Sequence, residues 1–338
     1  MTTLKQNFFH FFILLPIGFI LFLYANIGTY NRLLGDSLCS FYYAERLGLL
    51  RSIWYWRITW SGRYSAYAFD WLTTKFFDSQ TIIWFTPLVI IFWLFVNSTL
   101  IFLLLKSKAE NKNHIRLSVL LGAASVFAML TLIPSIEQSI FWVDGFRAYT
   151  LPIIILPIFF CGYFIFSDKI KSKFLASCLT FLLFFASGGL SETFAVFQFC
   201  LLAFWIATYW LLERPKSVDK NLFILIAGLL GAMTAIVVVA SAYGNVVRQS
   251  FSPPPVSLFE IIQISSKAYF DFLSGIIFTP QKATALFGVI FLSVWAGSLY
   301  QSQFSNHKNK IILQVFGALV LSFVCFPPGV YGYSEPPS

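Results

Sequence analysis

The sequence predicts an all-helical membrane protein, a single bundle of about nine transmembrane helices. Three observations predict this fold class. Of the 338 residues, 58% are hydrophobic and only 11% are charged, whereas soluble domains carry about 25% charged residues. Apolar runs of roughly 20 residues recur along the chain, each long enough to cross a ~30 Å hydrocarbon core. The net charge of +9 gathers in alternate loops, as it does in multi-pass membrane proteins.

The apolar runs define the expected spans in chain order. The first, 8–28, is preceded only by Lys5 and has no small-residue cleavage site, so we expect a retained span and not a signal peptide. The segment 174–212 is just long enough for two spans of roughly 20 residues with a tight turn between them. Each of the other runs gives one span: 82–105, 117–134, 149–166, 221–243, 283–300 and 311–326.

Basic residues set the expected orientation. With the N-terminus in the cytoplasm, the cytoplasmic loops hold 13 Lys and Arg against four acids, and they therefore carry the whole net charge of +9. The positive charge is explained by topology, so it indicates no nucleic-acid partner. We expect one transmembrane domain over 1–338, with the working face outward. Its outer loops are 29–80, 135–148, 187–191 and 244–282.

The longest outer loop, 29–80, sets charged residues among tryptophans and tyrosines. Asp36 closely follows the first span, and the sequence Trp60–Arg63 closes an amphipathic stretch. Apolar residues recur there at helical spacing, which predicts a helix along the membrane interface. These residues are Leu47, Leu50, Ile53, Trp54 and Ile58. Taken alone, Asp36 is more simply explained as a helix cap or a solvated charge.

The loop between the third and fourth spans is rich in charged and aromatic side chains. It brings Glu137, Asp144 and Arg147 together with Trp142 and Tyr149. A plain connector needs only a few turn residues. The alternatives here are an aromatic belt with a local salt bridge and a substrate-binding loop.

Glu192 lies at the midpoint of 174–212, in the sequence SGGLSET. Because the two spans leave almost no spare length, we expect this carboxylate in a tight turn at or below the outer boundary. An acid at that depth is costly and indicates function. The alternative is that Ser191 and Glu192 only cap the sixth helix.

Arg248 follows the seventh span, after Gly244 and Asn245 and before Pro253–Pro255. An arginine at the membrane exit is suited to binding phosphate through charge-assisted hydrogen bonds. The amphipathic segment 257–278 follows, and we expect it on or partly within the outer interface.

The ordered series of motifs resembles a group of bacterial membrane proteins within the GT-C glycosyltransferase superfamily. The similarity covers nearly the whole chain. The matching residues are Asp36, Trp60 to Arg63, Glu137, Phe141, Trp142, Gly145, Tyr149, Pro152, Gly189, Glu192, Gly244, Asn245 and Arg248. The resemblance implies a multi-span enzyme of the bacterial cytoplasmic membrane. It would transfer a sugar from a polyprenyl-phosphate carrier to a glycan, lipid or protein acceptor of the cell envelope.

The chemistry of such a transfer suggests a role for each candidate. An oxocarbenium-like transition state calls for a carboxylate base and for cations on the departing phosphate. We assign Asp36 as the base, with Glu137 and Glu192 as orienting or reserve acids. The expected substrate-binding residues are Arg63, Arg147 and Arg248 for phosphate, Trp60, Trp142 and Tyr149 for sugar stacking, and Asn245.

Two features depart from the family pattern. Gly35 and Ser37 flank Asp36 where such loops often carry adjacent acids, so a metal-assisted variant is less supported. The chain ends at Ser338 after an odd number of spans, and we therefore expect a C-terminally truncated protein.

The sequence indicates no cofactor. His10, His114 and His307 form no cluster, which disfavours zinc, and a divalent cation has no evident ligand set. Cys39 has no evident disulfide partner, and four cysteines fall within spans.

Two other functions remain open. A lipid-linked glycan polymerase or ligase would need a larger soluble outer loop. A transporter or flippase would place its charges near the bilayer midplane on broken helices.

Overall fold

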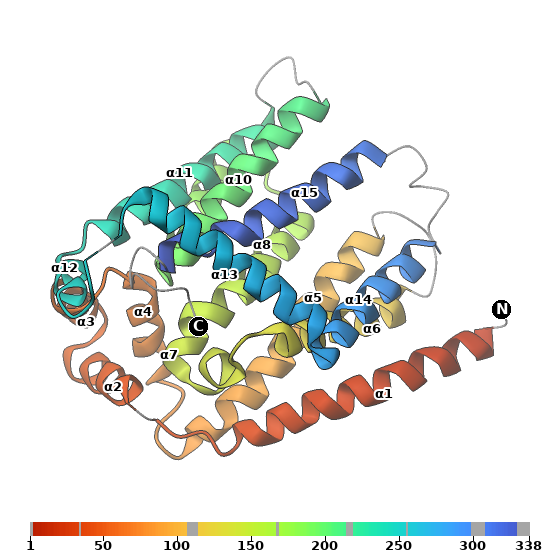
Figure 1. Cartoon of the computed structure of the whole chain (residues 1–338), viewed down its shortest axis with the longest axis horizontal. Helices are drawn as coiled ribbons and strands as arrows, with labels where there is room; N and C mark the ends of the chain where they lie inside the picture. The colour runs from red at the N-terminus through yellow and green to blue at the C-terminus, as the bar shows by residue number, and fades with distance from the viewer. Residues whose placement is uncertain are drawn as a thin grey trace.

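In the computed structural model every regular element of the described chain is helical, as the sequence predicts. The structure describes residues 3–33, 35–106, 114–166, 169–213, 219–254, 256–298 and 308–329. Figure 1 shows long helices packed as a bundle, with several short helices gathered at one end.

Six of the described helical segments are long and apolar enough to cross a membrane. They are Phe11–Gly28 in α1, Thr81–Lys106, His114–Leu132, Val143–Phe166, Glu192–Leu211 in α10 and Lys220–Ala240. The helices α13 (Leu258–Phe278) and α14 (Pro280–Ser298) form a further apolar pair bent by 83°. Two shorter apolar helices are Lys173–Gly188 and Val315–Gly329. The chain is thus a multi-pass helical membrane protein, and the number of nine spans stays a prediction.

The bounds of the long helices follow from the sequence. They are α1 (Thr3–Gly28), α5 (Phe85–Lys106), α6 (His114–Leu132), α8 (Leu151–Phe166), α9 (Lys173–Gly188), α10 (Glu192–Glu213), α11 (Lys220–Ala240) and α15 (Lys308–Val324). Asp219 caps α11 because its carboxylate accepts from the backbone N–H of Leu222 at 2.8 Å. Ser172 caps α9 in the same way.

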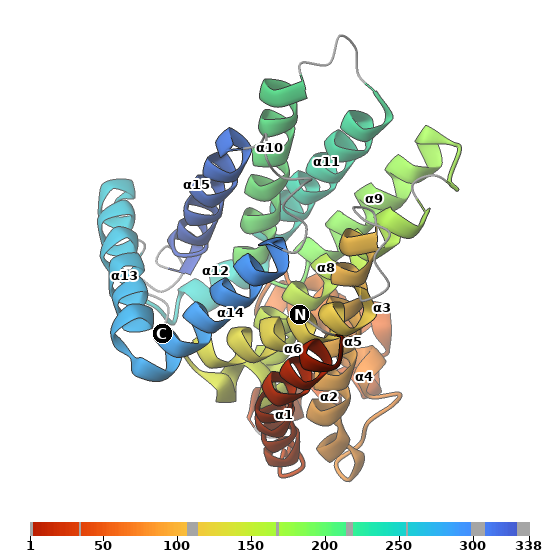
Figure 2. The same cartoon turned by 90° about the vertical axis from the view of Figure 1, so that its right-hand side faces the viewer.

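The helices pack around two buried cores. Trp93 and Ile90 of α5 pack with Leu120 of α6 in the larger core. The smaller core joins Phe184 of α9, Leu202 of α10 and Leu225 of α11. Figures 1 and 2 both show α10 between α11 and α15, and α9 packs along α11. Between membrane-spanning helices such cores are stabilised by close van der Waals packing, because lipid tails are as apolar as the side chains themselves.

The short helices lie together at one end of the bundle (Figure 1). They are α2 (Asp36–Leu47), α3 (Leu49–Thr59), α4 (Tyr64–Thr73) and α12 (Tyr243–Gln249). Gly48, with φ of +76°, separates α2 from α3 in a conformation that glycine adopts without strain. The helix expected around Leu47–Ile58 is α3, and its apolar residues Leu50, Trp54 and Ile58 are exposed.

The segment 135–148 differs from the expected loop. It contains two short π-helices, η2 (Glu137–Phe141) and η3 (Phe146–Thr150), and the short helix α7 (Val143–Gly145) lies between them. The apolar helical segment therefore begins at Val143 and not at Tyr149. Gly145 allows this packing, because a Cβ there would lie 1.7 Å from the backbone oxygen of Gln138.

Candidate functional site

The turn between α9 and α10 is attached to the start of α4. The carbonyl oxygen of Gly189 accepts from the backbone N–H of Ser65 at 3.1 Å and of Ala66 at 3.4 Å. These N–H groups are among those that a helix N-terminus leaves without an intrahelical partner. A Cβ at Gly189 would lie 2.4 Å from the Tyr64 ring, so the close approach requires glycine. The attachment places Glu192, the first residue of α10, beside the Trp60–Arg63 segment.

The Trp60–Arg63 segment is held against the end of α11 and the start of α12. A Cβ at Gly62 would lie 2.3 Å from the backbone oxygen of Val239. A Cβ at Gly244 would lie 2.6 Å from the backbone nitrogen of Ser61. Together with the turn between α9 and α10, three segments that are distant in sequence therefore meet: 60–66, 189–192 and 239–248.

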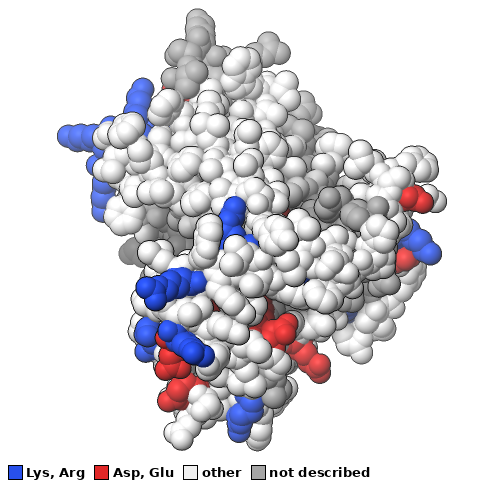
Figure 3. Space-filling model, turned by 90° about the vertical axis from the view of Figure 1, so that its left-hand side faces the viewer, with Lys and Arg blue, Asp and Glu red and all other residues white. Residues whose placement is uncertain are grey.

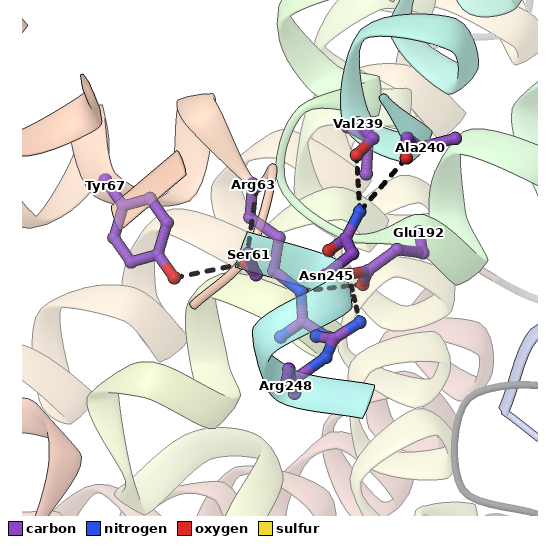
Figure 4. A network of polar contacts seen from close by, with 8 residues as sticks. All are labelled: Ser61, Arg63, Tyr67, Glu192, Val239, Ala240, Asn245 and Arg248. Atoms are coloured by element: carbon purple, nitrogen blue, oxygen red, sulfur yellow. Dashed lines mark hydrogen bonds and ion pairs between the residues drawn. The ribbon is translucent and has the colours of Figure 1, made fainter. Parts of the chain in front are cut away.

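The meeting point holds an ionic cluster, which we call the arginine cradle: Arg63, Glu192 and Arg248. Arg63 Nε lies 2.7 Å from Glu192 Oε2, and Arg248 Nη2 lies 3.0 Å from Glu192 Oε1. The three side chains are 25%, 25% and 19% exposed, respectively. Figure 4 shows the two guanidinium groups converging on one carboxylate. The cradle has one more positive than negative charge and is reachable from solvent, as an anion site requires.

Asn245 stands next to the cradle but serves the end of α11. Its amide nitrogen donates to the carbonyl of Val239 at 2.7 Å and of Ala240 at 3.5 Å (Figure 4). These are carbonyls that the helix C-terminus leaves without an intrahelical partner. The amide oxygen of Asn245 has no hydrogen-bond partner in the described chain, so the predicted substrate contact stays a prediction beside this structural role.

A second ionic cluster, the buried ion network, consists of Asp70, Asp144 and Arg147. Arg147 forms ion pairs with both carboxylates, and the side chains of Asp70, Asp144 and Arg147 are only 1%, 7% and 10% exposed. Ser37 and Ser40 of α2 donate to Asp144. The network ties α2, α4 and the 135–148 segment together.

Tyr67 connects the two clusters. The Arg147 guanidinium lies 5.1 Å from the centre of the Tyr67 ring, a cation–π contact. The Tyr67 hydroxyl is 3.1 Å from Ser61 Oγ, which in turn accepts from the backbone N–H of Arg63 at 3.4 Å. Burial raises the pKa of Tyr67, while the charge of Arg147 and the hydrogen bond with Ser61 act to lower it.

Asp36 lies at the edge of the buried ion network. It is the first residue of α2, is exposed, and is within electrostatic range of Asp144 and Arg147. Arg63 of the cradle acts on the same two groups. Among the described residues Asp36 forms no ion pair and no side-chain hydrogen bond, so its carboxylate is available to a ligand.

The other predicted site residues are not joined to the clusters. Trp60 is exposed, and its ring centre lies 6.2 Å from that of Phe251. Glu137 is exposed, Trp142 is partly buried and Tyr149 is half-exposed. None of these last three makes a side-chain hydrogen bond, ion pair or ring contact with either cluster in the described part of the chain.

Sequence reasoning did not assign a role to Asp70, Asp144, Ser37, Ser40 or Tyr67. A signal was present for part of this set. Ser37 and Ser40 are three apart and share a helix face directly after Asp36, and Asp144 precedes Arg147 by the same spacing. No spacing rule could link Asp70 to Arg147.

The side chains indicate no metal centre. Within the described ranges, no group of three or more His, Cys, Asp and Glu side chains is arranged to hold a metal ion.

Comparison with protein families, with curated proteins and with solved structures finds no match to this chain.

Figure 3 shows the face of the molecule on the left in Figure 1, where the short helices lie. Basic and acidic side chains stand side by side in the lower part of this face, below a wide uncharged surface.

Proposed function

We propose that this protein is a membrane glycosyltransferase of the GT-C type. It transfers a sugar from a polyprenyl-phosphate carrier to a cell-envelope glycan, lipid or protein at the outer face of the bacterial cytoplasmic membrane. The observation that supports this proposal is the convergence of Arg63, Glu192 and Arg248 at one end of the bundle, with Asp36 at the edge of the neighbouring ion network. These residues come from α2, the segment before α4, α10 and α12, yet they lie around one electrostatically connected region.

The proposed reaction divides the work between Asp36 and the cradle. The bond between the sugar C1 and the carrier phosphate oxygen breaks, and C1 forms a bond with the acceptor hydroxyl oxygen. Asp36 takes the proton of that hydroxyl, because its exposed carboxylate has no protein partner in the described chain and stands at the edge of the buried ion network. Arg63 and Arg248 hold the phosphodiester of the donor, whose single negative charge matches the single excess positive charge of the cradle, and the carrier phosphate leaves as a monoester.

The other candidates take supporting roles in this proposal. Arg147 is enclosed between Asp70 and Asp144, so we assign it to holding α2 and α4 in place and not to binding phosphate. Trp60 lies three residues before Arg63, and its exposed ring is available to a sugar. Glu137, Trp142 and Tyr149 remain predicted substrate contacts.

The test replaces Asp36 by Asn in a deletion strain whose envelope glycans are analysed by mass spectrometry. Loss of a general base typically reduces the rate by about 10²–10⁴-fold, so the glycan that the wild-type gene restores should be absent. Asp78→Asn is the matched control. Asp78 lies in the same outer loop, and its carboxylate accepts from Thr81 and Gln80 within its own turn.

Three results would separate the proposals. Full restoration by Asp36→Asn, with the variant present in the membrane, would refute the assignment of the base. Loss of a whole repeating polymer, and not of a single sugar, would favour the polymerase or ligase. Counterflow of a lipid-linked sugar in proteoliposomes would favour a transporter.

A further inference from the structure

Glu192 occupies an unusual position for a residue beside a phosphate site. Its carboxylate binds the two arginines that an anion would use, at 2.7 Å and 3.0 Å. A carboxylate held by two guanidinium groups is a poor proton acceptor, since its oxygens already accept charge-assisted hydrogen bonds. Its effect on a ligand is therefore electrostatic: its negative charge offsets one of the two positive charges that Arg63 and Arg248 supply.

We infer that Glu192 is a specificity-determining residue that adapts the cradle to a singly charged phosphodiester. This inference rests on the proposed function and names its donor by charge. With Glu192 ionised, the three side chains carry a net charge of +1, which one phosphodiester balances. A phosphate monoester or a diphosphate would leave excess negative charge in a partly buried site, where uncompensated charge is costly.

Arg57 lies near the cradle, where it donates to the carbonyl of Val238 and to Ser241 Oγ at the end of α11, but the ionic cluster that Tyr67 links to the cradle is acidic. The buried ion network has two carboxylates for one guanidinium, and Asp36 adds a further carboxylate at its edge. A second negative charge on the ligand would face these groups. The selection therefore depends on the balance within the cradle, and Glu192 sets that balance.

The experiment compares two probes that differ by one methyl group: farnesyl methyl phosphate, with one negative charge, and farnesyl phosphate. At pH 8 the second carries about two negative charges, because the second pKa of such a phosphate is about 6. Binding is measured by calorimetry on the full chain in nanodiscs of zwitterionic lipid. We expect the wild type to bind the diester more tightly.

Glu192→Gln should shift this preference toward the monoester by about tenfold. The variant removes the one negative charge of the cradle, so the net charge of the three side chains rises by one. The binding energy that a dianion gains from this change is about twice that of a monoanion. Glu192→Gln combined with Arg248→Gln returns the net charge of Arg63, residue 192 and residue 248 to +1, and it should restore the preference for the diester. The matched control is Glu45→Gln, which makes the same charge change at an exposed position of α2.

An unchanged affinity ratio in Glu192→Gln would overturn the inference, as would a wild type that prefers the monoester or binds neither probe. If Glu192→Gln does not fold, Arg248→Gln alone lowers the charge to zero, and the ratio must then move further toward the diester. Selection of the diester by a protein that transfers no sugar would defeat the proposed function alone. Transferase activity without any change of the ratio would defeat this inference alone.

Discussion

The arginine cradle and the buried ion network use the same chemistry in opposite proportions. The cradle has two guanidinium groups for one carboxylate and side chains 19–25% exposed. The network has two carboxylates for one guanidinium and side chains at most 10% exposed. Buried charge is costly unless it is paired, and every charge of the network is in an ion pair. Ser37 and Ser40 add hydrogen bonds to Asp144 alone, whereas the oxygens of Asp70 have no hydrogen-bond partner in the described chain and depend on the charge of Arg147. The cradle keeps a charge that is not balanced within it, and this suits a ligand.

The largest expected difference between the clusters comes from removing one arginine from each of them. Arg147→Met leaves Asp70 and Asp144 buried without their partner, and such a loss costs about 3–5 kcal/mol. Arg248→Met leaves Glu192 paired with Arg63 in a partly exposed site, where one ion pair contributes about 0–1 kcal/mol. We expect Arg147→Met to give little folded protein, and Arg248→Met to fold but bind farnesyl methyl phosphate at least tenfold more weakly.

Thermal unfolding in detergent, followed by fluorescence-detected size exclusion, measures the first effect, and calorimetry measures the second. Equal loss of stability in the two variants would show that the clusters do not differ as described. Retained phosphodiester binding in Arg248→Met would remove the cradle from the proposed site.

Gly62 offers a smaller test, because it joins the cradle to α11. A Cβ there would meet the backbone oxygen of Val239 at 2.3 Å, and backbone atoms cannot rotate away as a side chain can. We expect Gly62→Ala to cost about 1–3 kcal/mol by overpacking. The matched control is Gly18→Ala in α1, where a Cβ has nothing within 4 Å. That change should stabilise by about 0.5–1 kcal/mol, since alanine is the better helix former.

The two glycine variants should therefore shift the midpoint of thermal unfolding in opposite directions. A Gly62→Ala protein as stable as the wild type would mean that the loop and α11 are not in the described contact. Weakened phosphodiester binding in that variant would show that the contact of Gly62 with α11 helps to position Arg63.

The two clusters also differ in how far the sequence predicts them. Arg63, Glu192 and Arg248 were all candidates, because each charge stands at a membrane exit or in a turn that a connector does not need. The tight turn at 187–191 followed from length alone and is confirmed: α9 ends at Gly188 and α10 begins at Glu192. That the three groups bind one another did not follow, since their backbones meet only through tertiary packing.

The buried ion network was less predictable. Asp70 lies in α4, which is rich in aromatic residues, and the spacing of residues in this helix does not predict an ion pair with the 135–148 segment. That segment was expected as a loop, because single π-helical turns of five residues are too short to show a hydrophobic period in the sequence. Arg147 was consequently predicted as a phosphate ligand, whereas its burial between two carboxylates favours a structural role. Long apolar helices can be predicted from sequence, because a helix that crosses the membrane needs about 20 apolar residues. Ion pairs between short helices cannot be predicted in this way, because they depend on tertiary packing.

Tyr67 gives the smallest and most selective test, a pH dependence of stability. Burial raises the pKa of Tyr67 above its ordinary value of about 10. The folded protein then holds the phenolic proton more tightly than the unfolded chain does. This contribution to stability is complete below about pH 10 and is lost as the pH rises through the folded-state pKa. Stability should therefore fall between about pH 10 and the folded-state pKa.

Tyr67→Phe should reduce the slope of that fall, because it removes the titrating group. The variant also loses the contact of the hydroxyl with Ser61, but that loss shifts stability at neutral and alkaline pH alike. Only the difference in slope reports the buried phenol. Tyr30→Phe is the control, since Tyr30 is exposed in the segment between α1 and α2. Equal slopes in the wild type and Tyr67→Phe would place Tyr67 in contact with water, and the buried network would then be as open to a ligand as the cradle.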